Sequence, residues 1–422
     1  MNGEKAIAAA LRICADRFYG VPGYPVNGLI ELLDAEPVIN EKVALEYALG
    51  DSLAERRAAV IMKNVGLNAC TDPLVHATSM GLVSGVVIVS GDDPGAKGTT
   101  VAEDSRYFGE LAQVPVLEPD RETCGSSVAS AFEASESFSR VAILRLTPPL
   151  LESEVPDSSC TRQEQRGSRA DPNLTMRGRA ERADLLLQEL FQWSQLSRLN
   201  RIRGGSIGVG PAHGTSHLIT VYPPPPLPHG VVINEYGRPF VREHLTLEPP
   251  KLRKLPETFA SRGYCRTICP SCPYRALFRM MREKGLVAIC DMGCAILAAN
   301  PPFGCGVCGY GLGSSIAVAA RSTRVALVGD YALLHSGINA LIDVYEKRLP
   351  LLCIVMKNMR MGMTGGHRVF DPLKYVSWAE PEVHKAEDTR SLEKALRMTG
   401  EPHLLVVEGV CPEGEEHERV EC

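Results

Sequence analysis

The sequence has no apolar run long enough to cross a bilayer and no large excess of charge of either sign. No stretch reaches the roughly 18 consecutive apolar residues that a transmembrane helix needs, and the N-terminus lacks the charged-then-apolar layout of a signal peptide. The formal net charge is −5, with both signs interspersed, so nothing indicates binding to nucleic acid or to an anionic membrane. We therefore expect a cytoplasmic protein with neither kind of partner.

The chain is long, and it is rich in cysteine. Its 422 residues exceed what one hydrophobic core usually organises, which predicts two or three domains. Its 14 cysteines, in a protein expected to be cytoplasmic, are better interpreted as reduced thiols, some of them metal ligands, than as disulfide partners.

Alternation of short apolar runs with helical patterns predicts an α/β fold with parallel sheets covered on both faces. In the first half we expect short buried strands at Val60–Met62, Val86–Ser90, Val116–Leu117 and Val141–Arg145. The predicted organisation is an α/β domain at 1–150, an exposed linker at 151–183, a small middle region at 184–254, a second α/β domain at 255–412 and an acidic tail at 413–422.

The middle region is predicted from weaker signals. We expect a helix at Leu185–Leu196 and strands at Ser206–Val209 and Val231–Ile233, with a stiff proline-rich connector at Tyr222–Pro228 between them. His213 and His217 lie in a Gly-Thr-Ser loop, and we interpret them as solvated residues rather than a metal pair.

The stretch from Gly329 to His367 carries the strongest chemical signal. Buried strands are predicted at Val325–Val328 and Leu351–Met356, followed by Gly329-Asp330 and by Lys357-Asn358. Parallel strands deliver their carboxyl ends to one edge of a sheet, so Asp330 and Asn358 should lie side by side. Two oxygen ligands there suit a hard divalent cation that also holds phosphate oxygens. An ordinary sheet turn in which Asp330 caps the next helix is the alternative.

This spacing resembles the thiamine diphosphate motif, Gly-Asp-Gly followed about two dozen residues later by Asn-Asn. Tyr331 replaces the third motif residue and Lys357 the first Asn, so the match is to the loose form. The resemblance implies that Asp330, Asn358 and the Arg360 carbonyl hold Mg²⁺. It also implies that the turn of Gly329, Asp330 and Tyr331 meets the diphosphate. Met361 or Met363 is a candidate to support the bent cofactor, and core packing explains either equally well.

The first domain resembles the pyrimidine-binding domain of thiamine enzymes, in which a Glu begins a helix and a Gly-Asn loop follows the next strand. Glu41 occupies that Glu position, and Asn64 and Gly66 lie in the loop. By this resemblance Glu41 would share a proton with the aminopyrimidine ring. Glu46 competes for the role, and Glu41 could instead be an exposed acidic residue of a first helical turn.

The motifs together resemble the alpha subunit of indolepyruvate ferredoxin oxidoreductase, one of the 2-oxoacid:ferredoxin oxidoreductases. They occur in the same order and cover residues 5–150 and 255–412. The quoted segments are Gly20–Pro25, Asn40–Glu46, Met62–Asn68, Asp92–Gly95, Arg106–Tyr107, Val114–Pro119, Cys269–Arg275, Asp291–Cys294, Gly329–Asp330, His335–Gly337 and Met363–Gly365. The resemblance implies two thiamine diphosphate-type domains. The middle domain would be abridged, and the ferredoxin-like domain that usually ends these subunits would be missing.

The cysteines add a second chemical expectation. Cys269 and Cys272 form a CxxC motif, and Cys294 and Cys411 each follow a predicted strand, so all four could meet at one sheet edge. In the resembling family a similar set holds a [4Fe–4S] cluster. Zinc is the rival, because Cys305-Gly-Val-Cys308 is a second CxxC and Cys265 and Cys290 lie nearby. The remaining cysteines are interpreted as small apolar residues or surface thiols.

The resemblance implies thiamine-dependent oxidative decarboxylation of a 2-oxoacid, with an aryl pyruvate suggested by the family name. Its partners would be coenzyme A, ferredoxin or a ferredoxin-like subunit, and a second oxidoreductase subunit, in a homodimer or hetero-oligomer. His335 and His367 are candidates for proton donation or substrate contact. Two alternatives stay open: a non-oxidative 2-oxoacid decarboxylase and a non-catalytic subunit of a larger complex.

Overall fold

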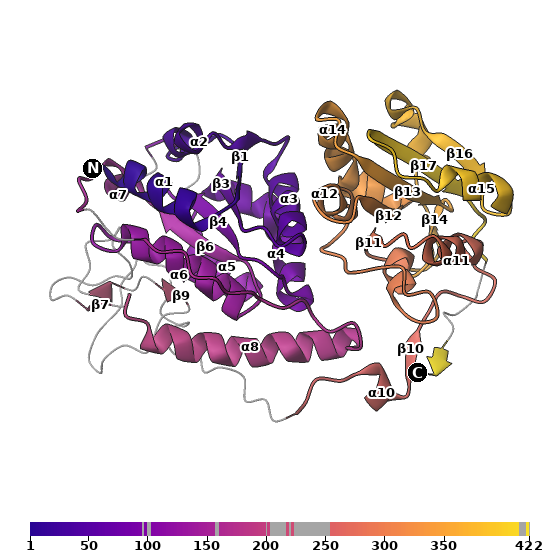
Figure 1. The fold of residues 1–422 in the computed structure, drawn as a ribbon, viewed down its shortest axis with the longest axis horizontal. Coiled ribbons are helices and arrows are strands. Elements are labelled where there is room, and N and C mark those ends of the chain that lie inside the picture. The colour runs from indigo at the N-terminus through magenta and orange to yellow at the C-terminus, as the bar shows by residue number, and fades with distance from the viewer. Residues whose placement is uncertain are drawn as a thin grey trace. The chain divides into compact units, whose positions relative to one another are not determined.

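The computed structural model divides the chain into two compact units (Figure 1). It describes residues 1–94, 97–98, 103–156, 160–199, 201–202, 217–218, 221–222, 254–412 and 419–421. The first unit comprises Met1–Ala170 with Ala180–Leu255, and the second comprises Asp171–Arg179 with Pro256–Cys422. Each unit is built on its own sheet.

The sheet of the first unit is parallel except for its last strand, which pairs antiparallel. Its strands lie in the order β2 (Glu36–Pro37), β1 (Arg17–Gly20), β3 (Ala58–Lys63), β4 (Val86–Gly91), β6 (Ala142–Leu146), β5 (Val116–Leu117) and β9 (Val221–Tyr222). β7 (Arg201–Ile202) and β8 (His217–Leu218) form a separate antiparallel pair.

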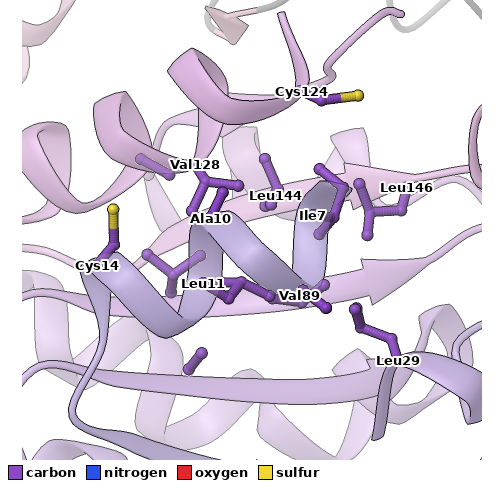
Figure 2. Close-up of a cluster of buried hydrophobic side chains, with 14 of the residues drawn as sticks. Ile7, Ala10, Leu11, Cys14, Leu29, Val89, Cys124, Val128, Leu144 and Leu146 are labelled. Atoms are coloured by element: carbon purple, nitrogen blue, oxygen red, sulfur yellow. The ribbon is translucent and has the colours of Figure 1, made fainter. Parts of the chain in front are cut away.

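Helices cover this sheet, and the core under two of them is large. The helical segments are α1 (Gly3–Cys14), α2 (Asn27–Leu33), α3 (Glu41–Leu53), η1 (Asn64–Gly66), α4 (Leu67–Met80), α5 (Arg106–Ala112), α6 (Cys124–Ser137), α7 (Pro148–Glu152) and α8 (Met176–Leu196). Figure 2 shows Ile7 and Leu11 of α1 and Val128 of α6 packed against Val89 and Leu144 of the strands. Alternate strand residues supply this face, as the two-residue period of a strand requires.

The sheet of the second unit is wholly parallel. Its order is β11 (Ile289–Cys290), β12 (Val325–Gly329), β13 (Leu351–Lys357), β17 (Pro402–Glu408) and β16 (Glu382–Lys385). Two antiparallel pairs flank it: β10 (Tyr264–Arg266) with β18 (Arg419–Glu421), and β14 (Arg360–Met361) with β15 (His367–Arg368).

Figure 1 shows α12 and α14 on one side of these strands and α11 and α15 on the other. The helical segments of this unit are α10 (Phe259–Arg262), α11 (Arg275–Glu283), η3 (Cys294–Ala299), α12 (Ser315–Ala320), α13 (Asp330–Ala332), η4 (Leu333–Gly337), α14 (Ile338–Glu346), η5 (Pro372–Lys374), η6 (Ser377–Ala379) and α15 (Thr389–Ala395). Leu277 of α11 and Leu392 of α15 join the buried cluster of the sheet.

The predicted α/β class with parallel sheets is confirmed, and the continuous apolar runs became strands close to their predicted positions. Strand β1 is among the strands that were not predicted, because the glycines and prolines of Gly20–Pro25 favour a loop there. Tyr19 is fully buried and its hydroxyl donates to Asp51 at 2.5 Å, so burial and pairing with β3 override the glycine- and proline-rich sequence that follows.

Residues 160–170, within the segment that we expected to form an exposed linker, pack in the first unit, whereas Asp171–Arg179 belong to the second. The N–H of Gly167 donates to the carbonyl of Val83, and that of Ala170 to Met80. Helix α8 also begins at Met176, nine residues before the predicted Leu185. Buried side chains such as Val155 and Ala170 explain the packing in the first unit, since isolated apolar contacts leave no periodic pattern in the sequence.

Much of the predicted middle region lies outside the described residues. This applies to the predicted strands at Ser206–Val209 and Val231–Ile233, to His213, and to the proline-rich connector beyond Tyr222. In the described part of the chain, none of the helices combines the length and apolar character needed to traverse a bilayer.

Candidate functional site

Asp330 and Asn358 lie together at the carboxyl edge of the second sheet. β12 and β13 pair in parallel with Gly329 opposite Met356, so the residues that follow both strands emerge side by side. The Asp330 carboxylate accepts hydrogen bonds from the backbone N–H groups of Asn358, at 3.1 Å, and Met359, at 2.6 Å. It also accepts one from Tyr331 at 2.9 Å. The carboxylate therefore joins two strand ends and does more than cap the helix after it.

Asp330 is only 2 % exposed. Burial raises the pKa of this carboxyl, and the backbone N–H groups and Lys357 offset only part of that effect. A bound cation would reverse the balance, because an opposite charge favours the ionised form. The position is chemically suited to a cation ligand.

The turn after Asn358 brings the third predicted oxygen ligand close. Oδ1 of Asn358 accepts the N–H of Arg360 at 3.0 Å, and Met359 adopts a left-handed φ of +58°, unusual for a residue with a side chain. Met361 lies in β14, paired with His367, and Met363 follows in the connecting turn with 42 % of its surface exposed. Asn358 and Arg360 thus belong to one turn, and the Asp330 carboxylate contacts that turn from the neighbouring strand end.

An irregular helix follows Asp330. The five residues Leu333–Gly337 form a π-helical turn between α13 and α14, a feature often found at functional sites. His335 in this turn is exposed, and its ring lies 5.6 Å from the ring of Tyr331 between centroids. His335 and Tyr331 are therefore surface neighbours beside Asp330.

Asp291 is a buried carboxylate to which the sequence analysis gave no role. It follows β11 and accepts hydrogen bonds from the N–H of Gly313 at 2.9 Å and from the Ser315 hydroxyl at 3.1 Å. The backbone of Gly313 also lies against the π-helical turn, because a Cβ at 313 would sit 2.3 Å from the nitrogen of Gly337. Asp291 thereby fixes the loop that supports the turn after Asp330.

Glu41 begins helix α3, and the loop after β3 lies directly against it. Asn40 caps the helix by accepting the Val43 N–H at 2.9 Å. A Cβ added to Gly66 would lie 2.6 Å from Cγ of Glu41 and 2.8 Å from its Oε1. Only a glycine allows this approach, so the structure brings Glu41 and Gly66 together.

Glu46, the competing carboxylate, is already paired. It is 1 % exposed and forms an ion pair with Lys42 one turn earlier in the same helix. In contrast, no hydrogen-bond donor or cation among the described residues pairs with the carboxylate of Glu41. These contacts favour Glu41 for any role that needs an available carboxylate.

Asn64 is fully buried, and both polar atoms of its side-chain amide form hydrogen bonds. Its Nδ2 donates to the carbonyl of Glu103 at 2.7 Å, and its Oδ1 accepts the Val65 N–H at 3.0 Å. Asn68 also donates to Glu103, to the carboxylate, at 3.1 Å. Asn64 therefore shapes the loop that carries Gly66.

The four predicted ligand cysteines form one group. The pKa of Cys272 is raised to about 12, first by burial and then by the neighbouring thiols of Cys269, Cys294 and Cys411. The pKa of Cys294 is likewise raised to about 12, by burial and then by Cys411 and Cys269. A Cβ at Gly362 would lie 3.4 Å from Sγ of Cys411 and 3.5 Å from Sγ of Cys294.

The second CxxC motif belongs to a different group. Cys305 and Cys308 are each 2 % exposed, and they lie near the fully buried Cys290, whose pKa is raised by burial and then by these two thiols. The structure thus separates the two CxxC motifs that a shared zinc site would have joined. Among the described residues, no three His, Cys, Asp or Glu side chains converge tightly enough to enclose a single metal ion.

Tyr274 lies close to both the cysteine group and Asp330. Its pKa is raised by burial, then by Asp330 and by Cys272, Cys411 and Cys294. The side chain is 3 % exposed, and no partner within the described chain satisfies its buried hydroxyl. An orphaned donor at this position fits a site that a bound group completes. No sequence signal singled out Tyr274 beyond its place after the CxxC motif.

Comparison with known proteins defines the class. The family model for the thiamine pyrophosphate enzyme, C-terminal TPP binding domain, matches residues 293–404, which contain Asp330 and Asn358. A thiamine diphosphate-dependent 4-hydroxybenzoylformate decarboxylase from Rhodococcus jostii RHA1 has a similar fold, with a TM-score of 0.60 at 14% identity over 98% of this chain and 100% of that one. Benzoylformate decarboxylase from Polynucleobacter necessarius gives 0.58 at 13% identity, covering 97% and 99%. The chain has the fold of thiamine diphosphate-dependent enzymes.

Within that class, the chain is similar to proteins named indolepyruvate oxidoreductase subunit IorA. The protein from Archaeoglobus fulgidus is 26% identical, with 86% of this chain and 75% of that protein covered. The protein from Thermococcus kodakarensis is also 26% identical with the same coverage, and that from Methanothermobacter marburgensis is 24% identical, with 87% and 76% covered. The resemblance to indolepyruvate oxidoreductase subunits predicted from the sequence motifs is confirmed.

Proposed function

We propose that the chain catalyses the thiamine diphosphate-dependent oxidative decarboxylation of a 2-oxoacid. An aryl pyruvate is the first candidate substrate, because the relatives are named for indolepyruvate. Electrons would pass through an iron–sulfur cluster to ferredoxin or a partner subunit, and coenzyme A would accept the acyl product. The observation that carries this proposal is the contact of Asp330 with the turn of Asn358 and Met359 at the sheet edge, with the four-cysteine group near it. We call this arrangement the Asp330 turn.

The Asp330 turn supports the magnesium assignment by its donor set. Mg²⁺ is usually held by one or two protein carboxylates together with substrate phosphates, so a carboxylate, an amide and a carbonyl oxygen are a fitting set. Asp330, Asn358 and the carbonyl of Arg360 would supply these oxygens. The backbone at Gly329 leaves room for a ligand, because a Cβ added there would meet no atom within 4 Å.

Glu41 supports the thiamine assignment in the first unit. When bound, thiamine diphosphate supplies an electron sink for decarboxylation. Glu41 would share a proton with the aminopyrimidine, a role that suits a carboxylate that pairs with no donor or cation among the described residues and lies against Gly66. Met361 and Met363 would support the cofactor from the β14–β15 turn, and Asn64 would act through the loop of Gly66.

The cysteine group favours an iron–sulfur cluster over zinc. A single zinc ion holds four thiolates about 2.3 Å away, which requires all four sulfurs to converge on one point. In a [4Fe–4S] cluster each of four cysteines binds a different iron, so the sulfurs surround a group larger than a single ion. Cys269, Cys272, Cys294 and Cys411 would hold it, and Tyr274 supplies a buried donor beside it.

Expected partners follow from the same chemistry. An electron carrier such as ferredoxin or a ferredoxin-like subunit must remove the electrons, and a second oxidoreductase subunit is expected from the relatives, which are named as subunits. At least a dimer is expected from the fold class. A cytoplasmic location is proposed for the assembly.

A non-oxidative 2-oxoacid decarboxylase is the second candidate, favoured by the similarity of the fold to benzoylformate decarboxylases. It would need the Asp330 turn and Glu41 but not the cysteine group. The four cysteines gathered beside Asp330 give the oxidative reaction more support. A non-catalytic subunit ranks last, because the chain retains both carboxylates expected of a catalytic thiamine protein, Glu41 and Asp330.

Electron paramagnetic resonance of anaerobically purified full-length protein tests the proposal. The protein, with thiamine diphosphate, Mg²⁺ and coenzyme A, is given a panel of 2-oxoacids that includes indolepyruvate. We expect one of them to produce the signal of a reduced cluster. Chemical analysis of the same protein should find four irons and four sulfides per chain. Cys272→Ser should lose the signal, whereas Cys353→Ala, at a buried cysteine in β13 outside the group, should keep it. Zinc without iron, or release of CO₂ and an aldehyde without an electron acceptor, would contradict the oxidative reaction.

A further inference from the structure

Two cysteines outside the proposed site meet in the first unit. Cys14 is the last residue of α1 and is fully buried, and Cys160 lies 146 residues later in the segment after α7 and is half-buried. Their Sγ atoms are 3.3 Å apart. Figure 2 shows Cys14 at the end of α1, beside the core that joins this helix to α6. The pair is too distant in sequence for spacing to predict it.

Contacts on both sides of the pair hold the two segments together. Arg162 forms an ion pair with Asp16, with N–O distances of 2.6 and 3.3 Å. The Arg57 guanidinium donates to the carbonyl of Gln163 at 2.6 Å. The contact between the sulfurs therefore does not depend on one loose side chain.

The two thiols are chemically unequal. The hydrogen bond between the two sulfurs lowers the pKa of Cys160 and raises that of Cys14. Burial raises the pKa of Cys14 further, whereas Cys160 is the more accessible sulfur. Thiolate character and access together decide which cysteine reacts first, so Cys160 is the nucleophile of the pair.

We propose that Cys14 and Cys160 are a redox modification site, at which thiol–disulfide exchange with a small-molecule disulfide forms an intramolecular disulfide. The Cys160 thiolate attacks one sulfur of the small disulfide, forming a mixed disulfide and releasing one small thiolate. The Cys14 thiolate then attacks Sγ of Cys160 and releases the second. Two electrons pass from the protein to the small disulfide, and the two protons lost by the cysteines are taken by the released thiolates.

The disulfide would fasten the segment after α7 to α1. A bond between sulfurs about 2.05 Å long requires only a small approach from their present separation. Because the bond would close a loop of well over 100 residues, it should restrict the unfolded chain strongly and stabilise the folded unit. This proposal does not depend on the proposed catalytic function, since neither cysteine belongs to the group near Asp330.

Peptide mapping of the full chain tests the proposal. The reduced protein is incubated with oxidised glutathione, alkylated and digested with trypsin. Cys14 lies in the peptide of residues 13–17 and Cys160 in that of residues 146–162, and neither peptide contains another cysteine. We expect these two peptides as a disulfide-linked pair, two mass units lighter than their reduced sum, and a melting temperature several degrees above that of the reduced protein.

Two variants make the outcome decisive. Cys160→Ser should abolish both the linked peptides and the redox dependence of the melting temperature, whereas Cys124→Ala, at a buried cysteine in α6, should keep both. The proposal is overturned if Cys14 and Cys160 of the wild-type protein both remain open to alkylation on unfolding after oxidation. It is also overturned if Cys160 keeps a bound glutathione and no disulfide with Cys14 forms.

Discussion

Gly66 leaves space for Glu41 that no other residue would leave. A Cβ at position 66 would lie 2.6 Å from Cγ of Glu41, closer than non-bonded carbon atoms approach. The backbone of Gly66 has an ordinary right-handed conformation, with φ of −66°. The need for glycine here therefore arises from the Glu41 side chain and not from the shape of the loop.

Gly66→Ala should consequently displace Glu41 and impair catalysis more than stability. We expect deuterium exchange at C2 of bound thiamine diphosphate, followed by nuclear magnetic resonance, to slow by about tenfold or more. The melting temperature should fall by no more than a few degrees, since overpacking of this size costs about 1–3 kcal/mol. Gly400→Ala is the matched control, because a Cβ there meets no atom within 4 Å. Equal exchange rates in both variants would show that Gly66 has no such role.

Removing the charge of Glu41 tests the same role directly. Glu41→Gln keeps the size of the side chain but cannot share a proton with the aminopyrimidine, so the exchange rate at C2 should fall about 10²–10⁴-fold. Glu46→Gln should instead lower the melting temperature, because it removes the charge with which the buried Glu46 pairs with Lys42. If Glu46→Gln slowed exchange and Glu41→Gln did not, the assignment would pass to Glu46.

Lys357 holds the turn that carries Asn358. Its Nζ lies 2.8 Å from Glu408 and 3.2 Å from Asp371, so it links the ends of β13 and β17 to the chain beyond β15. Lys357→Met should leave two carboxylates unpaired, lower the melting temperature by a few degrees and weaken magnesium-dependent cofactor binding about tenfold. Lys357→Arg should restore part of both. Unchanged cofactor affinity in Lys357→Met would mean that the linkage does not position Asn358.

Glu382 predicts a pH dependence of stability. Its carboxylate accepts hydrogen bonds from His384 at 2.8 Å, Arg397 at 3.1 Å and His403 at 2.9 Å. These partners, His384 first, lower its pKa to about 2 from the ordinary 4.5. A depressed pKa means that ionised Glu382 adds stability above about pH 4.5, and that this stability is lost as the pH falls toward 2.

The matching experiment compares melting temperatures of wild-type protein and Glu382→Gln between pH 6 and pH 3. The wild-type protein should melt higher at pH 6, and the two should converge as the pH falls below about 4.5. Glu387→Gln, at an exposed glutamate nearby, should behave like the wild type throughout. A difference between wild type and Glu382→Gln that stays constant over the whole range would refute the prediction.

Much of the fold could be predicted from the sequence because its central strands are fully buried. Continuous apolar runs such as Val86–Ser90 and Leu351–Met356 are typical of parallel strands, and their order set the edge at which Asp330 and Asn358 meet. Strand β1 was missed because Arg17 and the following aromatic residues give no such run, and it forms through tertiary pairing with β3.

The candidate site was predictable where a motif carried it and not elsewhere. The choice between Glu41 and Glu46 stayed open from spacing, although the four-residue separation of Lys42 and Glu46 is itself a sign of an ion pair within a helix. Tyr274 and Asp291 acquire their surroundings from segments far along the chain, and the pairing of Cys14 with Cys160 spans 146 residues. No local pattern reports such contacts.

Calorimetric titration of thiamine diphosphate into the full chain tests the central claim most directly, since that claim is that Asp330 and Asn358 hold the cation beneath a diphosphate. We predict binding in the presence of Mg²⁺, a loss of affinity of at least tenfold when the cation is chelated, and no measurable binding by Asp330→Asn that still unfolds cooperatively. Failure of the wild-type protein to bind, or equal affinities of wild type and Asp330→Asn in the presence of Mg²⁺, would contradict the account.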